Sequence, residues 1–161
     1  MEVFQTPQQW SAQLPTTLVI ACSDGRFQEE VDEFLRLHLA IDHYDRLFVP
    51  GGAGALVTSG AEFIRADRIR GECRFLIEAH GIERVILMVH GPASDGPAEA
   101  LCGDYQRRLP TSSQADIRRQ QDQDVERLRR DGLGDEVQIE FYRCEVTADG
   151  VVRFVPMHPR A

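Results

Sequence analysis

Four short β-forming runs alternate with stretches of helical periodicity along this chain, and this alternation limits the folds open to it. The runs are residues 18–21, 47–49, 85–89 and 137–142. Alternating strands and helices are typical of α/β proteins, in which helices connect neighbouring parallel strands. The first three runs are almost entirely apolar, as expected of strands that helices cover on both faces. The sequence therefore predicts an α/β fold with a mostly parallel central sheet flanked by helices.

Three segments between these runs are predicted to be helices. Residues 27–40 place Val31, Phe34 and Leu35 on one face, and residues 61–80 repeat such a pattern before a glycine that can end the helix. Residues 111–131 carry only a thin apolar stripe and are expected to lie at the surface. The last segment, residues 137–155, contains a turn-forming Asp149-Gly150 pair between two β-rich runs, which predicts a hairpin and an antiparallel edge strand.

Length and composition limit the domain organisation and the class of partner. A chain of 161 residues with 42% hydrophobic content is suited to one compact domain, and we expect a single domain over residues 1–161. The net charge of −8 argues against a nucleic-acid or anionic-membrane binder, since such proteins carry a basic face. The four cysteines show no CxxC spacing, and neither a signal peptide nor a membrane-spanning run is apparent, so we expect a cytoplasmic protein.

Two of the predicted strands end near side chains that can bind a metal. Cys22 follows the first strand, and His90 follows the third. In an open α/β sheet, ligands bind at the carboxyl ends of the strands, where the winding direction reverses. Thiolate and imidazole are preferred zinc ligands, and the nearby Asp24 and Arg26 can form a charge-assisted pair. The sequence therefore predicts a site built from Cys22, Asp24, Arg26 and His90.

A glycine-rich stretch, residues 49–55, follows the second strand. It has neither the GxGxxG spacing nor the Lys-Ser/Thr of a phosphate-binding loop, so we predict no nucleotide cofactor there. Glycines at a strand exit often allow a tight turn or a close approach of backbone to backbone. We expect this stretch to form a wall of the predicted pocket.

The order of these motifs resembles the β-class carbonic anhydrases. The motifs are Cys22-Ser-Asp-Gly-Arg26 after strand one, Gly-Ala-Gly at residues 52–54, and His90-Gly91 after strand three. Residues 71–90 resemble the family's helix and strand before its ligand histidine, and residues 141–154 resemble its last strands. The resemblance covers most of the chain. It implies a β-carbonic-anhydrase-like fold, zinc as cofactor, a lyase activity that hydrates CO2 or a related small linear substrate, and a homodimer or higher homo-oligomer.

The same resemblance assigns roles to individual residues. Cys22 and His90 correspond to zinc ligands of the family, and Asp24 and Arg26 correspond to a catalytic pair in which arginine holds the carboxylate away from the metal. The family's second ligand cysteine, in an HxxC motif, corresponds to Ala93, which has no donor atom. Asp24 is the nearest replacement, which gives a predicted Cys22, His90 and Asp24 ligand set. Asp95 and Cys102 lie farther along the following loop and helix.

Alternative interpretations use the same residues. Without metal, the protein would be a binding or regulatory protein for a small anion such as bicarbonate. In a third interpretation Cys22 is a reactive thiolate, activated by Arg26 and by the N-terminus of the next helix. Cys73, Cys102 and Cys144 are interpreted as core residues, because none belongs to a ligand-spaced cluster. Phe4 and Trp10 are expected to pack an N-terminal helix against a neighbouring subunit.

Overall fold

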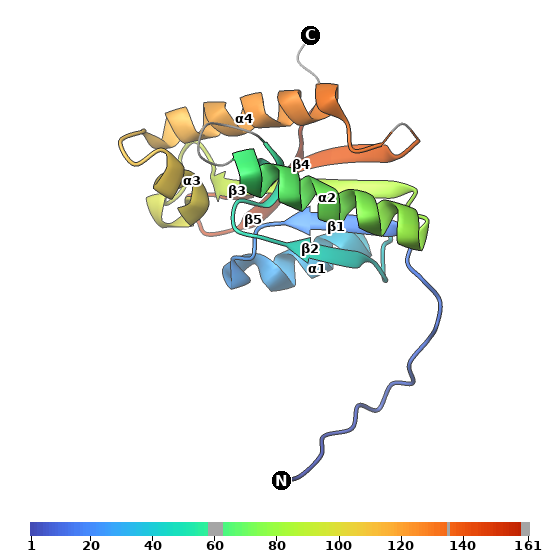
Figure 1. Cartoon of the computed structure of the whole chain (residues 1–161). Helices are drawn as coiled ribbons and strands as arrows, with labels where there is room; N and C mark the ends of the chain where they lie inside the picture. Colours follow the sequence, from blue (N-terminus) through green and yellow to red (C-terminus); the bar gives the residue numbers. More distant parts are fainter. Residues whose placement is uncertain (58–62, 135, 159–161) are drawn as a thin grey trace.

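Five strands form one sheet at the centre of the protein. The computed structural model describes residues 1–57, 63–134 and 136–158. The strands are β1 (Thr17–Ala21), β2 (Asp45–Phe48), β3 (Arg84–Pro92), β4 (Gln138–Val146) and β5 (Val152–Pro156). Their order is β2-β1-β3-β4-β5, with parallel pairing except between β4 and β5 (Figure 1). The predicted mostly parallel sheet with an antiparallel edge strand is confirmed.

Helices cover both faces of this sheet. They are α1 (Gln28–Leu37), α2 (Phe63–His80), α3 (Gly103–Arg108) and α4 (Gln114–Asp131), with short 3-10 turns η1 (Gly25–Phe27), η2 (Gly52–Leu56) and η4 (Ala98–Ala100). α1 packs on one face, where Val31, Phe34 and Leu35 contact side chains of β1 and β3. α2 and α4 share the other face, where their apolar side chains surround Leu18, Ile20 and Leu87. Neither face is open to solvent, which explains why β1 and β3 are nearly all apolar.

The element boundaries differ from the predicted ones in ways that matter for the site. β3 continues through His90 to Pro92, because its backbone pairs with β4 as far as Val146, so His90 lies inside the strand and not after it. Residues 98–108 form η4 and α3, which the sequence pattern did not indicate. The first two residues of the helix predicted over 61–80 lie outside the described residues, as do residues 159–161.

The N-terminal segment does not form the expected helix. Residues 1–15 contain no helix or strand, and the segment extends away from the sheet (Figure 1). Phe4 and Trp10 are 85% and 88% exposed, so neither contacts a core. Two isolated aromatic residues do not supply the repeated apolar face that a helix needs in order to pack. None of the described helices is long and apolar enough to cross a membrane.

Candidate metal centre

Three side chains from different parts of the chain meet at the carboxyl end of the sheet. Cys22 follows β1, His90 lies near the end of β3, and Cys102 is the residue before α3. The sulfur atoms of Cys22 and Cys102 are 4.0 Å apart. One ligand atom from each of the three residues lies within 4.8 Å of the others. Cysteine and histidine at this separation are the donor set that zinc prefers.

The His90 imidazole is buried without a hydrogen-bond partner. The residue is 4% exposed, and neither Nδ1 nor Nε2 has a partner among the described residues. Phe27 packs against the ring, with 4.6 Å between the ring centroids, and Gln121 Nε2 donates to the His90 carbonyl oxygen at 2.9 Å. Buried polar atoms normally have a partner. An imidazole held in place with both nitrogens unpaired is therefore suited to donate a lone pair to a metal ion.

The environment of Cys22 favours its thiolate. The pKa of Cys22 is lowered mainly by a hydrogen bond with the Cys102 thiol. His90 and the Gly51 N–H, which lies 3.4 Å from the sulfur, also lower this pKa, whereas burial raises it. The pKa of Cys102 is raised by its hydrogen bond with Cys22 and by burial. Burial raises the pKa of Cys73 and of Cys144 to about 12. The Cys22 thiol therefore differs from the two core thiols in its readiness to bind a metal.

Two glycines bring the loop after β2 against the sulfur of Cys22. Gly51 and Gly52 have φ angles of 92° and 54°, which residues with a Cβ rarely adopt. A Cβ on Gly52 would lie 2.4 Å from the Met88 carbonyl oxygen and 2.9 Å from the Cys22 nitrogen. The close approach lets the Gly51 N–H reach the thiolate. The glycine-rich stretch therefore contacts the Cys22 sulfur, but none of its residues lines the small cavity beside Cys22, where a wall was predicted.

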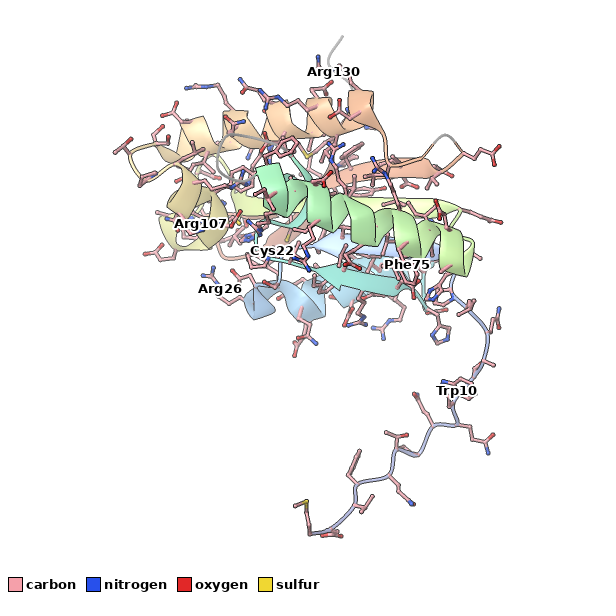
Figure 2. The ribbon with its side chains drawn as sticks, in the orientation of Figure 1. Trp10, Cys22, Arg26, Phe75, Arg107 and Arg130 are labelled. Atoms are coloured by element: carbon pink, nitrogen blue, oxygen red, sulfur yellow. The ribbon has the colours of Figure 1, made fainter. Side chains whose placement is uncertain are left out.

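Asp24 and Arg26 form a two-pronged ion pair beside the three-residue group. Arg26 Nε and Nη2 donate to the Asp24 carboxylate, the latter at 2.6 Å, and hydrogen bonds from Arg26 lower the pKa of Asp24. The Arg26 Nη1 donates to the Glu99 carbonyl oxygen at 2.8 Å. Arg26 therefore holds the carboxylate and also fixes the loop that leads to Cys102. Figure 2 shows Arg26 close to the N-terminal end of α1.

A small cavity of about 50 Å³ opens next to Cys22. Its walls combine the backbone of the Cys22–Gly25 turn with apolar side chains of α1 and β2, so a small molecule could approach the sulfur. The lining residues are Cys22, Ser23, Asp24, Gly25, Phe27, Gln28, Val31 and Phe48.

A buried ion-pair cluster fixes α3 and therefore Cys102. The Asp104 carboxylate accepts hydrogen bonds from Arg65, Arg107 and Arg108 at 2.9 to 3.0 Å, and its side chain is 2% exposed. The hydroxyl of the next residue, Tyr105, donates to Asp124 of α4 at 2.7 Å. These contacts attach the start of α3 to α2 and α4. The position of Cys102 is therefore set by the packed core rather than by a free loop.

The structure brings together Cys22 and His90 as the sequence predicted, and adds Cys102. Asp24 lies beside the group but is paired with Arg26, Ala93 is fully buried, and Asp95 is exposed. Cys102 is buried, as expected, but its sulfur faces Cys22 instead of packing only in a core. The available signal was a cysteine shortly after the incomplete HxxC motif. Its spacing from His90 matches no standard ligand pattern, so the sequence alone did not single it out.

Comparisons with known proteins agree with this architecture. The family model described as "Putative carbonic anhydrase" matches residues 13–106. No curated protein matches the chain. Among solved structures, the carbonic anhydrase from Streptococcus mutans is similar with a TM-score of 0.51 and 19% identity, covering 92% of this chain and 87% of that one. At this identity the likeness shows the fold alone, and the predicted β-carbonic-anhydrase-like fold is confirmed.

Two further solved structures are similar with lower TM-scores. The β-carbonic anhydrase CafA of Aspergillus fumigatus has a TM-score of 0.48 and 13% identity, covering 92% of this chain and 78% of that one. The β-carbonic anhydrase isoform I of Trichomonas vaginalis has a TM-score of 0.48 and 12% identity, covering 95% and 87%.

Proposed function

The chain belongs to the carbonic anhydrase family that its residues 13–106 match, and on this premise we propose that it binds zinc and hydrates CO2 or a related small linear substrate. The observation that carries the proposal is the group formed by Cys22, His90 and Cys102, whose ligand atoms lie within 4.8 Å of one another. Three protein ligands leave one position of a tetrahedral zinc ion open, as in catalytic zinc sites.

Cys102 takes the place of the ligand that is missing at Ala93. In this proposal it reaches the site from the start of α3, and the Asp104 ion pairs and the Tyr105–Asp124 hydrogen bond hold it there. The buried, unpaired nitrogens of His90 supply the second ligand, and the thiolate of Cys22 supplies the third. When bound, zinc supplies Lewis-acid activation of water near neutral pH.

Other residues of the chain prepare the site for a small substrate. Arg26 orients the Asp24 carboxylate through two donors and so keeps it as a catalytic hydrogen-bonding group. Phe27 fixes the His90 ring and contributes an apolar wall to the cavity of about 50 Å³, which suits a molecule of a few heavy atoms. If the ion pair with Arg26 breaks, Asp24 becomes free to act as the metal ligand that the sequence predicted. It would then fill the coordination position that would otherwise be open to water.

The direct test is CO2 hydration by zinc-loaded protein, followed by stopped-flow with a pH indicator. Cys22→Ser should abolish the activity and Cys73→Ala, a change in the core far from the site, should keep it. Turnover that persists in Cys22→Ser would contradict the assigned centre. Bicarbonate binding by calorimetry without zinc or turnover would instead favour the metal-free anion-binding alternative.

We also propose a cytoplasmic homodimer or higher homo-oligomer. Exposed apolar side chains lie on the N-terminal segment, at Phe4 and Trp10, and on α2, at Phe63 and Phe75, and an oligomer would cover them. Figure 2 shows Trp10 on the extended segment and Phe75 on α2. The four cysteines are free, in keeping with a reducing compartment. Light scattering of the full chain and of a chain lacking residues 1–14 measures the mass directly, and a monomeric full chain would contradict the assembly.

A further inference from the structure

Cys22 and Cys102 form a sulfur pair that differs from the other cysteines of the chain. Their sulfur atoms are 4.0 Å apart although 80 residues separate them in sequence. Cys22 is only half-buried and lines the small cavity, whereas Cys102 is 1% exposed and lies behind it. An accessible thiol with a second thiol directly behind it is the arrangement of an attacking and a resolving cysteine.

We propose that Cys22 and Cys102 form a reversible disulfide when a peroxide oxidises the metal-free protein, so that oxidation and metal binding compete for the same two sulfur atoms. The proposed disulfide is inferred from the 4.0 Å distance between the two sulfur atoms. Only its competition with a metal rests on the proposed zinc function.

The oxidation proceeds in two steps that balance. The Cys22 sulfur attacks one oxygen of hydrogen peroxide, the O–O bond breaks, and the products are a sulfenic acid at Cys22 and one water. The Cys102 sulfur then attacks the Cys22 sulfur, the S–O bond breaks, the S–S bond forms and a second water leaves. Two thiols lose two electrons in total, and the peroxide accepts them. An added thiol reductant reverses the reaction by exchange.

Formation of the disulfide requires a short movement of the Cys22 and Cys102 sulfur atoms toward each other. The sulfur atoms must approach from 4.0 Å to a bond length of about 2.05 Å. The contacts of Asp104 and Tyr105 hold the backbone at Cys102, and Cys22 directly follows the central strand β1, so the movement falls on the two side chains. The cavity of about 50 Å³ beside Cys22 gives hydrogen peroxide access to its sulfur.

The other two cysteines provide internal controls. Cys73 is a fully buried residue of α2, and Cys144 is buried on the opposite face of the sheet with α1. Neither lines the cavity beside Cys22, and burial raises the pKa of each thiol to about 12. Both should stay reduced under conditions that oxidise the pair.

The test is thiol counting and peptide mapping after treatment of the metal-free full chain with hydrogen peroxide. The four free thiols should fall to two, and mass spectrometry should find one peptide pair linking Cys22 to Cys102 of the same chain. A thiol reductant should restore all four. Cys102→Ser should give no internal disulfide, whereas Cys73→Ala and Cys144→Ala should still form it.

Four unchanged thiols, or a disulfide that includes Cys73 or Cys144, would overturn the proposal. Prior loading with zinc should prevent the loss of thiols, and the oxidised chain should no longer bind zinc. If the disulfide forms but zinc neither binds nor protects, the competition and the proposed metal function fail while the disulfide stands. If zinc binds and no disulfide forms, the proposed function survives and this inference fails.

Discussion

Replacing Cys102 by serine should weaken zinc binding about 100-fold. The three ligand atoms lie within 4.8 Å of one another, and the substitution leaves only Cys22 and His90 as strong donors, because a serine hydroxyl is a poor ligand. Structural zinc sites with four protein ligands are worth about 10–16 kcal/mol, so one ligand contributes about 3 kcal/mol. A loss of about 3 kcal/mol corresponds to roughly two orders of magnitude in Kd.

The assay is competition for zinc against a chromophoric chelator at fixed pH. Cys73→Ala is the matched control, since it changes a buried core thiol on α2 and should leave the Kd unchanged. Thermal unfolding of the metal-free variants separates a folding defect from the loss of a ligand. Asp24→Asn should alter the Kd by less than about tenfold, because Arg26 holds that carboxylate.

Wild-type affinity in Cys102→Ser would refute this reasoning. If Asp24→Asn instead lost the metal, the ligand set would be Cys22, His90 and Asp24, as the sequence predicted, and Cys102 would be only a buried neighbour.

Three further predictions test the surroundings of the site. Arg26→Gln should lower CO2 hydration about 100-fold while the zinc content stays the same, because the paired carboxylate and the Glu99 carbonyl lose their donor; unchanged turnover would count against a role for the ion pair. Gly52→Ala should lower the free energy of unfolding by about 3 kcal/mol, since its Cβ would lie 2.4 Å from a backbone oxygen of β3. Gly71→Ala, in open space on α2, should raise that free energy by about 0.5–1 kcal/mol. Equal effects of the two changes on urea unfolding would contradict the close approach of Gly52 to β3. Burial raises the pKa of Asp124, so the folded state favours its protonated form, and this contribution to stability is lost as pH rises above the unfolded value of about 3.9. The unfolding free energy of the wild type relative to Asp124→Asn should therefore fall as pH rises above about 3.9 in urea titrations, and a difference that does not vary with pH would refute the assignment.

The fold was predictable because its determinants are local. The apolar runs at β1 and β3 and the helical periodicity of α1, α2 and α4 each appear within a short window of sequence. The parallel pairing then follows from helices that connect the strands and cover both faces of the sheet, whereas the order of the strands comes from the structure. The N-terminal segment shows the limit of this reasoning, since two aromatic residues, Phe4 and Trp10, were interpreted as a packed helix although no repeated apolar face accompanies them.

The site was predictable only where its residues are contiguous or lie at strand ends. Cys22, Asp24 and Arg26 stand together in sequence, and their geometry follows from one turn after β1. Cys102 reaches Cys22 across 80 residues, through the loop that Arg26 fixes and the ion pairs around Asp104. Such an approach depends on tertiary packing, and no spacing rule in the sequence expresses it.

Elemental analysis of the chain purified without chelator, together with Cys22→Ser and Cys102→Ser, measures whether Cys22, His90 and Cys102 form a zinc site. We expect about one zinc ion per wild-type chain and marked loss in both variants. A wild-type chain that holds no zinc even at saturating metal would contradict this assignment.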